Sequence, residues 1–388
     1  MMKNTDVESY TSHMDIGNRQ LLDSSRGGGV SPKQLSQSSL DNHQGDTQEG
    51  IVAVILPCYN EEKTIAQVID EVFAVLPNAH IYVFDNNSND NSQNIVKAKI
   101  TEINALRASN LESQSTDSKP LDSKIPTKSL TLHSVSTQGK GAVMREAFAL
   151  IEADFYIMID ADTEHDASIL PQALAYFSTH KLDMLNIARE ADSSTYRKGH
   201  SFGNKLFSKS TQMLFGTKIN DMLSGYRIFS RPFVKSFPAH SNGFEIETEL
   251  TIYALEQRLR TDEIKAPYKS RPEGSFSKLS TFKDGFKILL MILNLLFSER
   301  PLLVFGVLSA ICFLLSLFFG VPVFVEFLET SKVARFPTLF VCVGLMVIAV
   351  VLFIAGLLAH LVTKSIKESR YLAYLQSKRE SYKGIYGE

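Results

Sequence analysis

Short apolar runs alternate with amphipathic stretches along the middle of the chain. Ile51–Leu56, Ile81–Phe84 and Phe155–Ile159 are apolar runs of strand length, the form that buried parallel strands take. Between the first two runs, apolar residues recur with helical spacing over residues 64–76. The pattern predicts an α/β domain with a mostly parallel sheet over residues 50–275.

Two polar segments break this pattern. Residues 1–49 are rich in Ser, Gln, Asp, Asn and Gly and have few large apolar residues, so we expect a disordered tail. Residues 104–129 are rich in Ser, Thr, Lys and Asp. We expect this stretch to be a surface-loop insertion between a helix and the strand Leu130–Val135.

The C-terminal third of the chain is far more apolar. Residues 301–325 and 336–363 contain no Asp, Glu, Lys or Arg, and each exceeds the roughly 20 residues that a membrane-spanning helix needs. The short linker 326–335 predicts that the two helices form a transmembrane hairpin over residues 301–363. Residues 282–297 are apolar but too short to span. We interpret them as an interfacial helix within residues 276–300, with a core helix as the alternative.

Charge around the hairpin predicts its orientation. Basic residues are concentrated on the two outer flanks, at Lys278, Lys283, Lys287, Arg300, Lys364, Lys367 and Arg370, and the linker has only Lys332 and Arg335. Because positive residues favour the cytoplasmic side, we expect an integral membrane protein with a cytoplasmic catalytic domain and a basic cytoplasmic tail at residues 364–388.

Overall composition excludes some functions. The chain has 40 basic and 42 acidic residues, which argues against nucleic-acid binding. Its three cysteines have neither metal-site nor disulfide spacing, as in proteins of a reducing compartment.

Polar residues follow three of the predicted strands. The segments 57–62 and 85–90 come directly after the first two strands, and Asp160, Asp162 and Glu164 follow the third. Carboxyl ends of parallel strands form a ligand crevice in open α/β sheets. Alternating acids there suit a divalent cation, Mg²⁺ or Mn²⁺, that bridges a diphosphate, although a solvated turn is the alternative.

A glycine-lysine segment precedes the acidic motif. Gly139, Lys140 and Gly141 lead into a predicted helix, where small residues allow a phosphate to approach the backbone and the lysine adds positive charge. The spacing is not that of a Walker loop.

Six ordered motifs together resemble glycosyltransferase family 2, whose members have a GT-A, Rossmann-like nucleotide-binding domain. The motifs are LPCYNEE (56–62), FDNNSND (84–90), GKG (139–141), DADTE (160–164), DMLSGYR (221–227) and GFEIETEL (243–250). The chain looks most similar to the polyprenyl- and dolichyl-phosphate hexose synthases that carry a C-terminal membrane hairpin. The likeness covers about residues 51–370, without the insertion.

The resemblance implies roles for individual residues. The residues expected to bind the nucleotide sugar are Pro57, Tyr59, Asn60, Glu61, Asp85, Asn87, Lys140 and Gly141. The expected catalytic residues are Asp160, Asp162, Asp221 and Arg227, and the expected metal ligands are Asp160, Asp162 and Glu164, the last at a position where many relatives have glutamine. The residues expected to bind the acceptor phosphate are Arg189, Arg197, Ser201 and Ser224. A turn-capping role for Asp221 and a structural ion pair for Arg227 are the alternatives.

The implied function is metal-dependent, inverting transfer of a hexose from a UDP- or GDP-sugar to a polyprenyl phosphate, undecaprenyl or dolichyl, at the cytoplasmic membrane face. The resemblance also allows a homo-oligomer. One alternative is a non-processive transferase acting on a lipid-linked saccharide or another hydroxyl acceptor. Another is a membrane scaffold with a degenerate nucleotide-binding domain. A processive synthase is disfavoured because the chain lacks tryptophan, and with it the Gln-x-x-Arg-Trp element of such enzymes.

Overall fold

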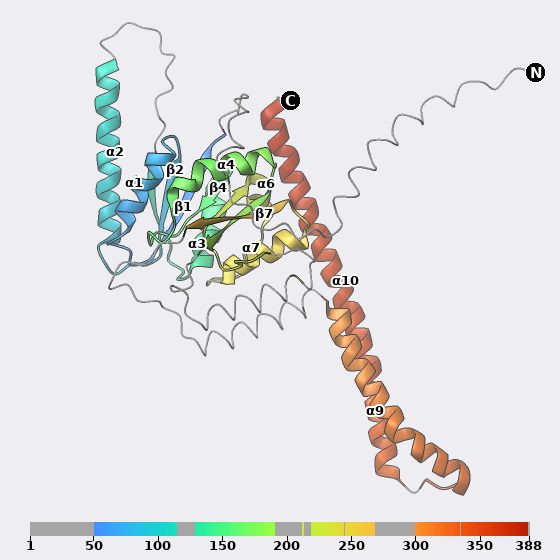
Figure 1. The fold of residues 1–388 in the computed structure, drawn as a ribbon. Helices are drawn as coiled ribbons and strands as arrows, with labels where there is room; N and C mark the ends of the chain where they lie inside the picture. The colour runs from blue at the N-terminus through green and yellow to red at the C-terminus, as the bar shows by residue number, and fades with distance from the viewer. Residues whose placement is uncertain are drawn as a thin grey trace, which may run out of the picture.

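The computed structural model describes residues 50–114, 129–190, 212, 219–243, 245–267, 297, 300–333 and 335–386. These residues form an α/β domain and a pair of long helices that extend away from it (Figure 1). The predicted fold class, α/β with a mostly parallel sheet followed by two apolar helices, is confirmed. The predicted tail at 1–49 and most of the predicted interfacial helix at 276–300 lie outside the described residues.

Seven strands form one sheet in the order β3-β2-β1-β4-β6-β5-β7. The strands are β1 (Val52–Cys58), β2 (His80–Asp85), β3 (Ser129–Ser134), β4 (Phe155–Met158), β5 (Met184–Glu190), β6 (Arg227–Ser230) and β7 (Thr261–Pro267). Of these seven, β6 alone runs antiparallel to its neighbours β4 and β5. The other six strands therefore end at the same edge of the sheet, and β6 begins there.

The strand order reverses beside β1. The chain passes from β1 to β2 and β3 on one side, and then returns to place β4 on the other side of β1. Cys58 pairs with Asp85, so β1 and β2 end level with each other. Open α/β sheets bind ligands at such a reversal, outside the carboxyl ends of the strands.

Helices cover both faces of the sheet. They are α1 (Ile65–Val75), α2 (Ser92–Gln114), α3 (Lys140–Leu150), a 3₁₀ turn (Ala167–Ile169), α4 (Leu170–Thr179), α6 (Arg231–Ser236) and α7 (Glu245–Glu256). In β1, Val54 and Leu56 join the core that includes α1 and α4, whereas Ala53 and Ile55 join the core that includes α3 and α7. Burial on both faces explains why this strand is apolar at every position.

One helix extends further than the sequence predicts. Residues 104–114 belong to α2 rather than to a loop, so the predicted insertion is wrong for that part. The segment contains Ala, Leu, Arg, Glu and Gln, which are good helix formers even though its apolar face is weak. Residues 115–128 of the predicted insertion lie outside the described residues.

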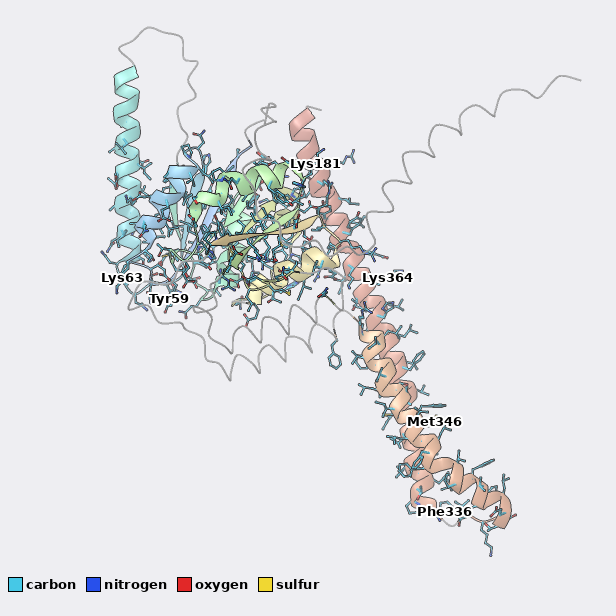
Figure 2. All side chains as sticks on the ribbon, viewed as in Figure 1. Tyr59, Lys63, Lys181, Phe336, Met346 and Lys364 are labelled. Carbon is cyan, nitrogen blue, oxygen red and sulfur yellow. The ribbon has the colours of Figure 1, made fainter. Side chains whose placement is uncertain are left out.

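Two long helices, α9 (Pro301–Thr330) and α10 (Phe336–Tyr386), form a hairpin. Both are long and apolar enough to cross a membrane. Ser309 and Ser316 of α9 donate hydrogen bonds to carbonyls of α10, at 2.7 and 2.8 Å. Many large apolar side chains on the hairpin point away from the protein, as Figure 2 shows, and Phe318 and Phe340 are each 72% exposed.

The helix α10 continues well beyond its apolar half. Residues 364–386, which the sequence analysis treats as part of a basic tail, are helical and lie along the α/β domain (Figure 1). Tyr374 donates a hydrogen bond to Asp183 at 2.8 Å. Arg370 and Lys367 pair with Glu256 at 3.3 and 3.5 Å. The hairpin is therefore fixed to the domain by polar contacts.

Candidate active site

The loops after β1 and β2 hold each other in place. The backbone N–H groups of Asn60 and Glu61 donate to Ser88 Oγ and Ser92 Oγ, both at 2.9 Å. In return, the N–H of Asn89 donates to Asn60 Oδ1 at 2.7 Å. These bonds join the two segments whose residues the resemblance assigns to the nucleotide sugar.

Three loops at this edge contain a residue in the left-handed region. The φ angles are 56° at Asn60, 62° at Asn87 and 60° at Thr163. Asparagine tolerates this conformation, but a β-branched residue such as threonine adopts it rarely. The backbone at Thr163 is therefore strained. Because Thr163 separates Asp162 from Glu164, this strain lies inside the acidic motif, and backbone strain is common at functional sites.

Asp85 ends β2 with an unsatisfied oxygen. The side chain is 1% exposed, and Oδ2 accepts hydrogen bonds from Gln93 at 2.7 Å and from the N–H of Ser88 at 3.3 Å. Oδ1 has no partner among the described residues. A buried acceptor without a donor costs about 1–3 kcal/mol, so this oxygen is suited to an N–H group of a ligand.

Asp85 also affects the cysteine beside it. Burial raises the pKa of Cys58 to about 12, and the nearby Asp85 carboxylate adds to the effect. Cys58 is therefore a neutral thiol that packs under the loop.

A buried lysine links two acids from distant parts of the chain. Lys140 Nζ lies 2.5 Å from Asp160 Oδ1 and 2.7 Å from Glu247 Oε1, and its side chain is 7% exposed. Burial lowers the pKa of Lys140, but the two carboxylates outweigh burial and raise it above its usual value. Burial likewise raises the pKa of Asp160, and Lys140 outweighs that effect and holds it well below its usual range. Asp160 is thus ionised and paired.

Glu247 is a residue of this cluster that the sequence pattern does not single out. It begins the second half of the motif GFEIETEL, where three glutamates alternate, and the alternation alone does not show which one points inward. The structure places Glu247 in the first turn of α7, facing Lys140.

At two positions near this cluster, neighbouring atoms lie so close to the backbone that only glycine fits. A Cβ on Gly225 would lie 2.2 Å from Asp160 Oδ2 and 2.6 Å from Lys140 Nζ. A Cβ on Gly141 would lie 2.2 Å from the carbonyl oxygen of Ser241. The N–H of Gly141 donates to the carbonyl of Asn242 at 2.9 Å. The backbone that approaches Gly141 is therefore protein, not the phosphate that the sequence analysis expects.

The surroundings of Asp162 disfavour its charged form. Burial raises its pKa to about 6, and the neighbouring carboxylates of Asp160 and Glu164 add to the effect. A bound cation would relieve this crowding. No group of three or more His, Cys, Asp or Glu side chains is arranged to hold a metal among the described residues, so the expected set of Asp160, Asp162 and Glu164 is not assembled. In chemical type, the carboxylates of Asp160 and Asp162 suit a divalent cation whose other ligands are phosphate oxygens.

A second pair of charges lies further along the same edge. Arg189, at the end of β5, donates to both carboxylate oxygens of Asp221, at 2.7 Å from Nε and 2.8 Å from Nη2. The side chain of Asp221 is 6% exposed and that of Arg189 is 23% exposed. Asp221 therefore orients Arg189, which is the more accessible member of the pair.

The structure corrects the expected roles of Arg227 and Ser224, since both are fully buried. The guanidinium of Arg227 donates to the carbonyls of Ser224 and Met222, at 2.9 and 2.8 Å, and to Thr251 Oγ1 at 2.7 Å. Ser224 Oγ donates to the carbonyl of Ile187 at 2.6 Å. Burial lowers the pKa of Arg227 to about 10. These side chains fold the 221–227 loop against β5 and α7 instead of facing an acceptor.

Two further expected site residues, Arg197 and Ser201, lie outside the described residues. Pro57, Tyr59, Asn60 and Glu61 lie at the end of β1 and in the loop after it, as expected.

Known proteins with similar sequences include glycosyltransferases. The family model described as glycosyl transferase family 2 matches residues 53–110. An uncharacterized protein of Shigella flexneri is 48% identical over 157 residues, which are 40% of this chain and 96% of the relative. The low-salt glycan biosynthesis hexosyltransferase Agl6 of Haloferax volcanii is 28% identical over 63% of this chain and 53% of its own length.

Among solved structures, the chain is similar to glucosyl-3-phosphoglycerate synthase from Mycobacterium tuberculosis in complex with Mn²⁺, uridine diphosphate and glucosyl-3-phosphoglycerate. The TM-score is 0.43 and the identity 20%, over 63% of this chain and 80% of the other. From the family match and the Shigella relative, together with the acidic motif at the reversal of the sheet, we conclude that the chain belongs to glycosyltransferase family 2.

Proposed function

We propose that the protein transfers a hexose from a nucleotide sugar to a polyprenyl phosphate at the cytoplasmic face of a membrane. The observation that carries the proposal is the position of the candidate site relative to the hairpin. In Figure 2, Tyr59 lies at the lower edge of the domain and the apolar hairpin extends downward from the domain, whereas Lys181 lies near the upper edge. A lipid head at the membrane surface would meet this edge.

The donor would bind over β1 and β2. Uracil and guanine both carry ring N–H groups, and the unpaired Oδ1 of Asp85 is a suitable acceptor for one. The braced loops that contain Tyr59, Asn60, Glu61 and Asn87 would surround the base and ribose. A UDP- or GDP-hexose is therefore the proposed donor, and the hexosyltransferase Agl6 supports this class of sugar.

The diphosphate would lie at Asp160 and Asp162. Mg²⁺ or Mn²⁺ held there would stabilise the charge that develops on the leaving diphosphate. Lys140 pairs with both Asp160 and Glu247, which fixes the position of Asp160 and offsets part of the negative charge of the acidic motif. Asp162 is the carboxylate that gains most from a cation, because its own surroundings disfavour its ionised form.

The acceptor half of the site favours a phosphate over a hydroxyl. A hydroxyl acceptor needs a general base, and Asp221, the expected candidate, has both carboxylate oxygens bonded to Arg189. A phosphate monoester is already largely dianionic, with a second pKa of about 6. It needs positioning more than deprotonation, and an arginine held in place by Asp221 is suited to that role. Inversion at the anomeric carbon is what the family resemblance implies.

Membrane anchoring belongs to the same proposal. The apolar parts of α9 and α10 leave their side chains uncovered, which a lipid environment accommodates and water does not. The concentration of basic residues on the outer flanks of the hairpin supports a cytoplasmic α/β domain.

A transfer assay tests the proposal. Detergent-solubilised full-length protein is incubated with Mg²⁺ or Mn²⁺, a panel of labelled nucleotide sugars, and undecaprenyl or dolichyl phosphate, and the organic phase is counted. We expect metal-dependent labelling from one donor. The variant Asp162→Asn should lose it, whereas Asp70→Asn, which removes a surface ion pair with Lys99, should keep it. Donor turnover without any organic-phase product would reject the lipid-phosphate acceptor.

A further inference from the structure

A cavity of about 430 Å³ lies between the cytoplasmic half of α10 and the α/β domain. One wall is the connection from α7 to β7, residues 256–260, and the other is α10 between Lys367 and Lys378. Asp183, which also lines the cavity, precedes β5, and Arg260 precedes β7. The cavity therefore lies at the amino edge of the sheet, opposite the candidate active site, and its volume is within the range of small-molecule sites.

The acidic side chains that line this cavity already have partners. The pairs are Asp183 with Tyr374 at 2.8 Å, Glu256 with Arg370 at 3.3 Å and Lys367 at 3.5 Å, and Glu368 with Lys364 at 3.8 Å. Asp183 also accepts from the N–H of Arg260 at 3.0 Å. The negative charge of the cavity is thus compensated by the protein itself.

Several donors at the cavity are not matched by an acid. Arg258 and Arg260 form no ion pair with any residue in the described part of the chain. Lys378 donates to the neutral hydroxyl of Tyr374 at 3.0 Å. Gln257 is buried, and its amide nitrogen has no acceptor among the described residues. The cavity therefore has more donors and positive charge than the protein uses.

We propose that this cavity binds a phosphate-bearing ligand. Guanidinium groups match phosphate oxygens in geometry and charge, and Arg258 and Arg260 extend from the same short connection. The stacked rings of Tyr371 and Tyr374 provide an aromatic wall for the remainder of the ligand. A ligand in contact with both walls would strengthen the attachment of α10 to the domain.

The position along α10 favours a soluble source for the phosphate. Lys378 is 14 residues beyond Lys364, where the apolar part of α10 ends, so it lies about 21 Å further along the helix axis at 1.5 Å per residue. At that distance from the apolar segment, a soluble phosphorylated compound reaches the cavity more readily than a lipid headgroup does. A headgroup offers the same chemistry, and the experiment separates the two sources.

Because the chain contains no tryptophan, a single introduced tryptophan reports on its own surroundings without background fluorescence from other tryptophans. In full-length Tyr371→Trp protein in detergent, we expect inorganic phosphate or pyrophosphate to change the fluorescence in a saturable way, while sodium chloride at equal ionic strength does not. Adding Arg258→Gln and Arg260→Gln should weaken the response at least tenfold. The matched pair Lys97→Gln and Arg379→Gln removes the same charge from exposed positions elsewhere and should leave it intact.

A second arm uses the reporter protein in phosphatidylglycerol and in phosphatidylcholine nanodiscs without free phosphate. A response specific to phosphatidylglycerol, and lost in the arginine variant, assigns the phosphate to a lipid headgroup. If the arginine variant unfolds, Lys378→Gln replaces it and should weaken binding several-fold. The proposal is overturned by no saturable response in either arm, or by a response that survives the cavity substitutions. Sugar transfer is not measured, so the result does not depend on the proposed function.

Discussion

The two halves of the candidate site differ in how completely their polar groups are satisfied. In the donor half, at β1, β2 and β4, Asp85 has a buried oxygen without a partner among the described residues, and crowding raises the pKa of Asp162 to about 6. In the acceptor half, Asp221 is bonded at both oxygens to Arg189, and Arg227 is bonded to its own loop. Among the described residues, the proposed donor half leaves polar groups for a ligand to complete, whereas in the proposed acceptor half Asp221 and Arg189 are already paired.

The largest expected effect comes from removing the cation that stabilises the donor half. In Lys140→Met, the buried Glu247 and the part-exposed Asp160 lose their shared partner. Breaking a buried ion pair on one side costs about 3–5 kcal/mol, so the free energy of unfolding should fall by that amount in a denaturant titration. Lys97→Met, at an exposed position, is the control and should change little. A loss below about 1 kcal/mol would show that the cluster is hydrated and not buried.

The acceptor half can be tested through its kinetic signature. Asp221→Asn keeps the shape of the side chain but weakens its hold on Arg189. Hydrogen bonds to charged groups are worth about 1.5–3 kcal/mol, so the KM for the lipid acceptor should rise about 10- to 100-fold. The KM for the donor should stay near its original value. A fall in kcat at unchanged acceptor KM would instead identify Asp221 as a general base. The proposed difference between the donor half and the acceptor half would then not hold.

The smallest effect concerns pH. The pKa of Asp162 is raised in the folded protein, so its ionisation opposes folding, and the resulting penalty appears as pH rises from about 4 through about 6. Without metal, Asp162→Asn should therefore be more stable than the original protein at pH 8, by roughly 1–3 kcal/mol, and equally stable at pH 4. Melting curves in chelator at both pH values measure this. Equal stability at both would mean that Asp162 is not crowded by its neighbours.

Local patterns in the sequence predicted much of the fold. The continuous apolar runs located β1, β2 and β4 to within a few residues, because strands buried on both faces are apolar at every position. The acidic and amide residues after them were expected at one edge, and the parallel pairing places them there. Charge and length marked the two long apolar helices.

Other features depend on contacts between distant residues. Lys140 and Glu247 are 107 positions apart, and neither position has a local signal that it faces the other. Spacing within the motif DMLSGYR did not show that Arg227 is buried, because one of its partners, Thr251, comes from α7, 24 positions away. The docking of α10 on the domain rests on single polar contacts, such as Tyr374 with Asp183, which periodicity does not reveal.

Two lipids that differ only in their head group distinguish a phosphate acceptor from a hydroxyl acceptor. The purified protein is given the labelled donor that it uses, together with either a polyprenyl phosphate or the polyprenyl alcohol of the same chain length. Because both carboxylate oxygens of Asp221 are bonded to Arg189 and a phosphate acceptor needs no general base, we predict transfer to the phosphate at a rate at least about a hundredfold above the alcohol. Equal or faster transfer to the alcohol would contradict the account and indicate a hydroxyl acceptor.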